Sequence, residues 1–230
     1  MAENRFYLDA PLKEGSLVRL EGEEAHHLHR VMRRNEGDLV EIVNGRHQLA
    51  IAQVTQIEKR AVHLKLQEVN TTPPPPFQII LAQALLRPKN LDLVIEKGTE
   101  LGATAFYLFP GERSEKQTLS STQKERLRHL SISALKQCGR LDLPQILEKP
   151  PLTAWEKPEG TLLYGDLSST SPLPSPTGDT LIFIGPEKGL SSAEEKILSN
   201  TFKASGIRLN SNILRAETAA ICSLSLIASK

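Results

Sequence analysis

Four successive prolines at positions 73–76 constrain the folding of this chain more than any other feature of the sequence. Proline fixes φ and has no backbone N–H, so such a run continues neither a helix nor a central strand and favours an extended spacer. The chain has 230 residues, which is enough for two modest domains. We therefore expect a boundary here, with one domain over residues 1–72 and a second over residues 73–230.

Before the prolines, the pattern is short and β-like. Residues 17–21 and 39–43 form brief β-like runs that Gly22 and Gly45 end, and residues 62–67 alternate apolar and polar side chains with the period of a half-buried strand. One helix is predicted at about residues 23–34. The first domain is therefore expected to be a small β-barrel or sandwich.

After the prolines, strand and helix signals alternate. Pro88 suits the first turn of a helix that Gly102 ends, and Ser191 with Glu194, or Ser192 with Glu195, makes a capping box for another helix. Further helices are predicted at about 122–137 and 215–228, and strands at 77–86, 104–109, 161–164, 180–184 and 206–209. Such alternation predicts an α/β domain with a mainly parallel sheet that helices cover on both faces.

Two loops in the C-terminal third carry glycine or charge at the point where a predicted strand ends. They span residues 185–189 and 209–218. Because the ligand crevice of an open α/β sheet lies at the carboxyl ends of its strands, the two loops together predict a bound small molecule. The first loop lacks the spacing of a phosphate-binding P-loop, and no dinucleotide fingerprint follows the first strand of this domain. A single loop of this kind could also be an ordinary strand-to-helix turn.

The two loops also carry a family resemblance. Residues 184–190 (IGPEKGL) and 213–219 (ILRAETA) resemble the signature of the knotted SPOUT methyltransferases. More narrowly, the chain resembles the RsmE family, which methylates N3 of one uridine in 16S ribosomal RNA. Segments 96–102, 136–140 and 26–38 support this narrower match. The chain departs from the family pattern at Lys188, Lys136 and Asn210.

The resemblance implies a trefoil-knotted α/β domain that follows a PUA-like β-barrel. It implies S-adenosylmethionine as cofactor, held by three loops with these residues: Tyr164, Gly165, Gly185, Glu187, Gly189, Leu209, Ile213, Leu214 and Thr218. It further implies a homodimer in which the last helix packs across the interface of the C-terminal domains. The apolar stripe of that helix suits this role, although a buried helix of a monomer would show the same pattern.

Methylation of uracil N3 requires loss of a weakly acidic proton, which a base or a cation that stabilises the uracil anion would assist. Arg215 is expected to be that cation, holding either a phosphate or the pyrimidine oxygens. Glu217 is a candidate proton acceptor. An acid in the first turn of a helix is also stabilised by the helix dipole without any catalytic role.

RNA contact is expected from basic side chains, because such groups hold phosphate without reading sequence. Arg30, Arg33 and Arg34 recur at helical spacing and are predicted to share one face. The expected RNA-binding residues are Arg30, Arg33, Arg34, Arg87, Lys89, Arg113 and Arg140. The partner implied by the resemblance is 16S ribosomal RNA or the small ribosomal subunit. Each of these residues could instead belong to a solvated surface.

The remaining sequence features concern the cellular location of the chain and metal binding. Two cysteines far apart, Cys138 and Cys222, fit neither a disulfide framework nor a metal site, so a cytoplasmic location and no metal are expected. No signal peptide or membrane-spanning run is visible.

Two other functions stay open: ribose 2′-O or guanine methylation by the same scaffold, and a non-catalytic ribosomal RNA-binding assembly protein, which Lys188 would favour.

Overall fold

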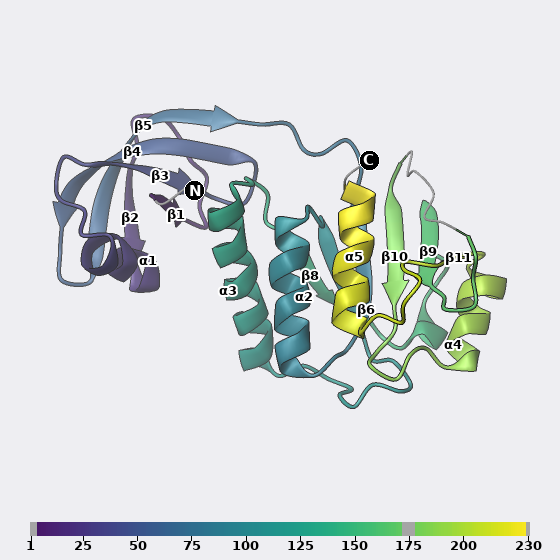
Figure 1. Ribbon diagram of the computed structural model, residues 1–230. Helices are drawn as coiled ribbons and strands as arrows, with labels where there is room; N and C mark the ends of the chain where they lie inside the picture. Colours follow the sequence, from purple (N-terminus) through teal and green to yellow (C-terminus); the bar gives the residue numbers. More distant parts are fainter. Residues whose placement is uncertain (1–3, 172–177, 229–230) are drawn as a thin grey trace. The chain divides into compact units, whose positions relative to one another are not determined.

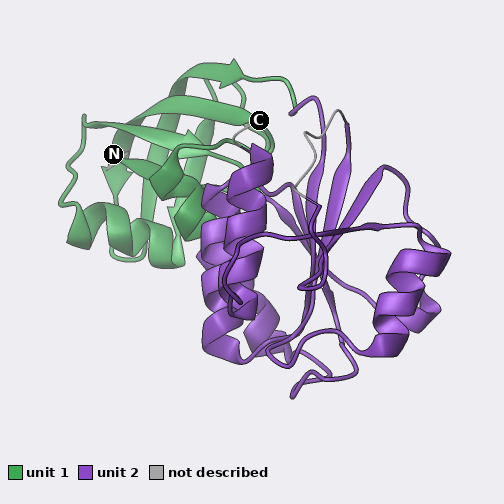
Figure 2. Ribbon diagram, turned by 45° about the vertical axis from the view of Figure 1, so that its right-hand side comes forward, with its two compact units in different colours: residues 1–74, 132–143 green, residues 75–131, 144–230 purple. Residues whose placement is uncertain are grey.

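The computed structural model describes residues 4–171 and 178–228. These fall into two compact units, coloured separately in Figure 2. The first comprises residues 1–74 and 132–143, and the second comprises residues 75–131 and 144–230. One border, between Pro74 and Pro75, falls inside the proline run. Residues 132–143, which the sequence analysis placed in the second domain, group instead with the first unit.

The first unit is built on one five-stranded sheet with the order β1-β3-β4-β5-β2. Its strands are β1 (Arg5–Tyr7), β2 (Leu17–Glu21), β3 (Leu39–Val43), β4 (Gln48–Ile57) and β5 (Ala61–Thr71). β1 pairs with β3 in parallel, and the other pairs are antiparallel. In β5 the apolar Val62, Leu64 and Leu66 are buried while Lys65 and Gln67 are exposed, so the predicted alternation is confirmed.

The helix of the first unit is shorter than expected. It consists of α1 (Gly22–His26) and a π-helical turn, η1 (His27–Val31), and it buries Ala25 and Leu28. Arg33 takes a left-handed conformation with φ 53°, which a right-handed helix cannot continue. The helix therefore ends at Val31, and the prediction that it extends to residue 34 is wrong.

The second unit contains a six-stranded sheet with the order β11-β9-β10-β6-β7-β8. Its strands are β6 (Ile79–Ala84), β7 (Ala105–Phe109), β8 (Gln145–Glu148), β9 (Thr161–Gly165), β10 (Thr180–Ile184) and β11 (Ser205–Ile207). All five strand pairings are parallel, as predicted. The last strand covers residues 205–207 rather than 206–209, and the short edge strand β8 was not foreseen. The trefoil knot implied by the resemblance stays a prediction.

Helices cover both faces of this sheet (Figure 1). α2 (Pro88–Glu100) and α5 (Ala216–Ala228) pack on one face, and α3 (Ser121–Cys138) stands beside them. α4 (Ser192–Lys196), its π-helical continuation η3 (Ile197–Thr201) and the short 3-10 turn η2 (Leu152–Ala154) contribute to the other layer. In β10, Ile182 and Ile184 join the first core while Leu181 and Phe183 join the second. The strand is buried on both sides because its side chains alternate between two helical layers.

Candidate functional site

A cavity of about 810 Å³ lies at the carboxyl edge of the second unit's sheet. Three loops form its walls: residues 165–168 after β9, residues 185–190 after β10, and residues 207–214 after β11. Parallel strands end at the same edge of a sheet, so the topology itself brings these loops together. The cavity falls within the roughly 300–1,000 Å³ that is typical of small-molecule sites.

The cavity gathers nearly all of the expected cofactor residues. It is lined by Tyr164, Gly165, Gly185, Glu187, Gly189, Leu209, Ile213 and Leu214. Thr218 is exposed and lies outside the lining, whereas Ala216 and Ala219 of the same helix belong to it. Successive residues of a helix point about 100° apart, so a position two residues after Ala216 faces another direction.

Close packing requires glycine in the loop after β10. A Cβ added at Gly185 would lie 2.8 Å from the backbone nitrogen of Leu190, which is closer than real side chains approach. Gly189 has φ +74°, and its N–H donates to Pro186 O at 2.8 Å to close a tight turn. The two glycines therefore let the loop fold tightly beside the cavity and leave its backbone groups at the cavity wall.

Two side chains from neighbouring segments hold this loop through its carbonyl groups. Arg113 donates from Nη1 to Lys188 O at 3.3 Å and to Leu190 O at 3.0 Å. The buried Gln83 of β6 donates from Nε2 to Ile184 O and Gly185 O, both at 3.3 Å. Arg113 was expected to contact RNA, but in the structure its guanidinium is engaged by the cavity loop. Gln83 was missed, although a glutamine inside the apolar run 77–86 was a visible signal.

Glu187 of the same loop points to the start of α2. Its Oε1 accepts a hydrogen bond from the backbone N–H of Arg87 at 2.9 Å and another from Asn90 Nδ2 at 3.2 Å. Pro88 occupies the first turn of the helix, as predicted. A carboxylate at this place satisfies N–H groups that have no partner inside the helix. Glu187 thus ties the cavity loop to α2.

The Arg87 side chain, which was expected to bind RNA, pairs with Glu115. Arg87 Nε and Nη2 donate to the two carboxylate oxygens of Glu115 at 2.9 and 2.8 Å. These hydrogen bonds hold the pKa of the Glu115 carboxyl below its ordinary value and raise the pKa of the Arg87 guanidinium. Both groups are exposed, so the pair contributes little to stability. Its effect is to orient Arg87 toward Glu115.

Tyr164 and Asp166 supply polar groups at the end of β9. Burial raises the pKa of the Tyr164 hydroxyl above 10, and the negative charge of Asp166 acts in the same direction. The Tyr164 hydroxyl is therefore protonated at neutral pH. Asp166 Oδ1 accepts hydrogen bonds from Ser168 N at 2.8 Å and Ser168 Oγ at 2.7 Å. Both residues line the cavity, and Asp166 was not foreseen.

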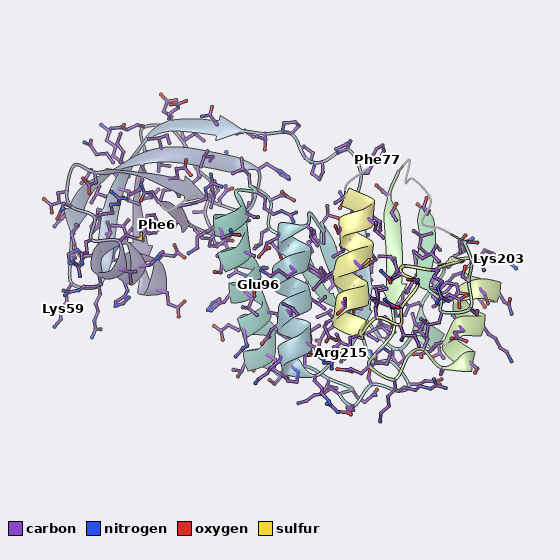
Figure 3. The ribbon with its side chains drawn as sticks, viewed as in Figure 1. Phe6, Lys59, Phe77, Glu96, Lys203 and Arg215 are labelled. Atoms are coloured by element: carbon purple, nitrogen blue, oxygen red, sulfur yellow. The ribbon has the colours of Figure 1, made fainter. Side chains whose placement is uncertain are left out.

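The two expected catalytic residues lie at the start of α5. Figure 3 shows Arg215 at the end of this helix that lies toward the carboxyl ends of the strands. Arg215 is exposed, and its guanidinium makes no hydrogen bond or ion pair with any residue that the structure describes. Glu217 is only 8% exposed, and within the described chain its Oε2 has no hydrogen-bond partner. Of the two expected catalytic residues, Arg215 is thus a cation without a partner among the described residues, and Glu217 is a buried carboxylate.

The remaining expected RNA-binding residues differ in their availability. Arg30, Arg33 and Lys89 are exposed, whereas Arg34 donates to Asn4 Oδ1 and Arg140 pairs with Asp142. Because the helix ends at Val31, Arg33 and Arg34 do not continue its face with Arg30, so the prediction of one helical face is wrong.

The structure shows the surroundings of the three residues that depart from the family pattern. Lys136 pairs with the carboxylate of Glu24. Lys188 is exposed, and its carbonyl accepts a hydrogen bond from Arg113. Asn210 does not need positive φ; its Oδ1 accepts the N–H of Asn212 at 2.9 Å, which makes an Asx turn.

Two other features are absent from the described part of the chain. No group of three or more His, Cys, Asp or Glu side chains there is arranged to hold a metal ion. No helix among residues 4–171 and 178–228 is long and apolar enough to cross a membrane.

Known proteins resemble the chain in sequence. Residues 73–228 match the RNA methyltransferase domain family, and residues 20–67 match the RNA methyltransferase PUA domain family. The ribosomal RNA small subunit methyltransferase E of Rickettsia conorii is 31% identical, over 99% of this chain and 96% of its own length. The protein of the same name from Bacillus subtilis is 29% identical, over 94% of this chain and 91% of its own.

Solved structures agree with the sequence comparison. A methyltransferase of Legionella pneumophila in complex with S-adenosylmethionine has a TM-score of 0.87 at 26% identity, covering 98% of this chain and 97% of the other. A ribosomal RNA small subunit methyltransferase E from Neisseria gonorrhoeae, bound to S-adenosyl methionine, has a TM-score of 0.86 at 26% identity and covers 96% and 95%. Since the domain family spans residues 73–228 and a 31% identical relative aligns with nearly the whole chain, the chain belongs to the ribosomal RNA small subunit methyltransferase E family.

Proposed function

We propose that this chain transfers a methyl group from S-adenosylmethionine to N3 of one specific uridine in the 16S RNA of the small ribosomal subunit. Membership of the family gives the reaction class. The observation that supports the site is the cavity at the carboxyl edge of the sheet, with the free guanidinium of Arg215 at the start of the adjoining helix. The cytoplasm, where ribosomes assemble, is the proposed compartment.

The donor set of the cavity suits S-adenosylmethionine. Loops that expose backbone N–H and C=O groups can recognise adenine, and the apolar side chains of Leu209, Ile213 and Leu214 can pack against its ring. The carboxylate of Asp166 provides negative charge for a cationic ligand. When bound, S-adenosylmethionine supplies a methyl group on a positively charged sulfur. The loops have to hold that group in line with the attacking nitrogen, because orientation supplies much of the rate of a displacement reaction.

Arg215 is proposed to stabilise the uracil anion that forms when the N3 proton leaves, or to hold a flanking phosphate. Its guanidinium has no competing partner among the described residues, so its donors are available to RNA. A cation aimed at developing negative charge lowers the barrier most where water is excluded. The position of Arg215 beside the cavity is what supports this role.

Glu217 is proposed as the proton acceptor, with stabilisation of the α5 N-terminus as the alternative role. Replacing Glu217 by Gln keeps the shape of the side chain but removes its basicity. Loss of a general base slows turnover by roughly 10²–10⁴-fold. If the Glu217→Gln protein instead turns over normally and only its melting temperature falls, the residue acts through the helix dipole.

Three exposed cations are each proposed to contact the RNA substrate: Arg30 and Arg33 of the first unit, and Lys89 of the second. A homodimer formed through α5 is also proposed. The helix buries Ala220, Ser223, Leu224 and Ile227 within its own unit and leaves Ile221 partly exposed. Sedimentation of the purified chain at twice the monomer mass of 25.4 kDa would support the dimer, and sedimentation as a monomer at micromolar concentration would contradict it.

Two measurements test the proposed reaction. Calorimetry should show S-adenosylmethionine binding to the purified chain; no heat of binding would support a non-catalytic RNA-binding protein. Mass spectrometry of 16S RNA from cells lacking the gene should show loss of one N3-methyluridine, which the purified enzyme restores on small subunits from those cells. Loss of a 2′-O-methyl group or a methylguanine instead would assign the scaffold to another methylation.

A further inference from the structure

Arg208 connects two of the three loops that form the cavity. It directly follows β11, which ends at Ile207, and it is one of the cavity-lining residues. Nothing in the motifs of the sequence distinguishes it, because it stands between a short strand and the motif that begins at Leu209. Its contacts, rather than its position in a motif, indicate what it does.

The guanidinium of Arg208 donates to backbone carbonyl groups on two separate segments. Nε donates to Asn210 O at 3.0 Å and Nη2 donates to Ser211 O at 2.8 Å, both within the loop after β11. Nη1 donates to Leu167 O, in the loop after β9. The backbone N–H of Arg208 adds a bond to Ser171 O at 3.0 Å. One residue therefore joins segments that lie some forty positions apart in sequence.

The loop after β11 has few other internal bonds. Within the described residues, its other contacts are the Asx turn of Asn210, a bond from Ser211 Oγ to Asn210 Oδ1 at 3.4 Å, a weak contact from Cys222 Sγ to Leu209 O at 4.0 Å, and the packing of Leu209 against the core. Ile213, near the end of the loop, is 78% exposed and gives it little anchoring. A loop with few packed contacts is easily displaced, so the hydrogen bonds from Arg208 carry much of its order.

Arginine is suited to this task and lysine is not. Its planar fork carries several N–H donors in fixed directions, and it stays charged at all relevant pH values. An ammonium group is a single point of charge, and it cannot reach carbonyl groups on both sides of the cavity in the same geometry. Hydrogen bonds from a charged donor are also roughly twice as strong as those between neutral groups.

We propose that Arg208 is a positioning residue for methyl transfer: its guanidinium holds the loop after β9 and the loop after β11 together, and so keeps two walls of the cofactor cavity in the arrangement that accepts S-adenosylmethionine. The inference rests on the proposed function. Arg208 acts through the backbone of its neighbours, and it is distinct from Arg215, whose guanidinium is free.

The first test compares Arg208→Ala, Arg208→Lys and wild type by calorimetry and kinetics in the full chain. Loss of three charged hydrogen bonds should weaken S-adenosylmethionine binding roughly ten- to hundredfold. The KM for S-adenosylmethionine should rise in parallel, while kcat at saturating cofactor stays within about threefold of wild type, because uniform binding is what is lost. Arg208→Lys should recover only part of the affinity. Unchanged affinity in Arg208→Ala would overturn the proposal.

Arg126→Ala is the matched control, because Arg126 pairs with Asp92 outside the cavity lining. It also removes one arginine and one set of charged hydrogen bonds. It should shift the melting temperature at most slightly and leave the affinity for S-adenosylmethionine unchanged. A loss of affinity as large as that of Arg208→Ala would show that the effect is not specific to the cavity loops.

The second test needs no cofactor, so it separates this inference from the proposed function. Amide hydrogen exchange on the unliganded chain should be roughly tenfold or more faster over residues 166–171 and 208–214 in Arg208→Ala than in wild type, with β10 unchanged. Equal exchange rates would overturn the positioning role even if the wild type binds S-adenosylmethionine. Conversely, exchange could be faster in Arg208→Ala while the wild type binds no S-adenosylmethionine. That result would refute the proposed function but support the role of Arg208 in holding the two loops together.

Discussion

Arg215 and Arg208 lie at the two ends of one loop and differ in what their side chains contact. The Arg208 guanidinium donates three hydrogen bonds to backbone carbonyl groups, whereas Arg215 is exposed and has no partner among the described residues. A charged side chain without protein partners contributes little to folding, so its presence beside a cavity points to a ligand. The same residue type thus has a structural role at one end of the loop and a proposed catalytic role at the other.

Replacing Arg215 by Ala should therefore separate activity from stability. We expect the rate of methyl transfer to fall by roughly 10²–10³-fold, as for removal of one charge-stabilising donor. The free energy of unfolding should change by no more than about 0.5 kcal/mol, because an exposed side chain is removed. Methylation assays and thermal melts measure the two effects. Unfolding of the Arg215→Ala protein would assign the residue to structure.

The sequence identifies residues whose role depends only on their neighbours along the chain. Gly185 and Gly189 could be predicted because tight turns need glycine wherever they occur. The partners of Gln83 and Arg208 could not be predicted, because they include carbonyl groups that the fold brings from distant segments. Asp166 was missed although its partner Ser168 is local. Thr218, expected to bind the cofactor, lies outside the cavity lining although Ala216 belongs to it, because successive residues of a helix point in different directions.

At the scale of elements, the start of α2 depends on a side chain from another loop. The residue before the helix, Arg87, does not cap it with its own side chain, and Glu187 accepts its N–H from outside. We expect Glu187→Ala to lower the free energy of unfolding by about 0.5–2 kcal/mol, the range for loss of a helix cap. Denaturant unfolding measures this effect, and Glu125→Ala on the exposed side of α3 is the control.

Glu187 also lines the cavity, so the same variant tests its expected role in cofactor binding. If the carboxylate acts mainly on α2, S-adenosylmethionine affinity in Glu187→Ala should stay within about threefold of wild type. A loss of affinity with unchanged stability would instead show that the carboxylate acts on the cofactor.

The strands and helices that the sequence predicted correctly are those with strong periodicity or clear end signals. The run before Gly185 and the helix between Pro88 and Gly102 are of this kind. The edge strand β8 was missed because only Ile146 and Leu147 mark it as apolar, and Leu147 is exposed. The helix near residue 30 was extended too far because nothing in the sequence marks Arg33 as left-handed.

The segment after α3 carries a pH-sensitive pair. Burial by itself would raise the pKa of the Asp142 carboxyl, but the hydrogen bond and charge of Arg140 outweigh burial and hold the pKa below its ordinary value of 3.8. A carboxyl with a lowered pKa in the folded state stabilises the protein above its ordinary pKa. That stabilisation is lost as the pH falls through the folded pKa.

Asp142→Asn should therefore be less stable than wild type at neutral pH, on the order of 1–2 kcal/mol for a charged hydrogen bond. The difference should begin to shrink below about pH 4, where the unfolded chain binds a proton at Asp142, and should disappear only as the pH falls through the lower pKa of the folded state. Denaturant unfolding of both proteins between pH 3 and pH 7 measures it. A difference that stays constant across this range would contradict the Arg140–Asp142 contribution.

In the whole molecule, the boundary at the proline run does not separate all residues of the two units, because residues 132–143 belong to the first. They group with the first unit although they follow the proline run by more than fifty positions. Within that unit the Lys136 side chain pairs with Glu24, and the backbone of Asp142 forms an isolated antiparallel β-bridge with that of Arg46. The sequence shows where the chain passes from one pattern to the other, but not that a later segment returns to complete the first unit. Composition changes along the chain cannot report a contact between distant segments.

The pairing of cations within the fold limits which side chains can hold RNA, because several cations that look free in the sequence have protein partners. Arg87, Arg113, Arg140 and Lys136 all have protein partners. Of the residues predicted to bind RNA, Arg30 and Arg33 are the exposed ones on the described part of the first unit. Arg33 has positive φ, so Asn, which tolerates that conformation, is the suitable replacement. Arg30→Ala combined with Arg33→Asn thus removes two charges with little strain.

We expect this double variant to bind 16S RNA less tightly at low salt, and to lose the difference from wild type as salt rises. Each phosphate contact contributes about 0.7 to the slope of log affinity against log salt for single-stranded RNA, so two lost contacts should reduce that slope by about 1.4. Filter binding over a salt series measures the slope, with Arg126→Ala as a control that removes one positive charge elsewhere on the surface. A weaker affinity with an unchanged slope would mean that Arg30 and Arg33 act on the fold of the first unit rather than on phosphate.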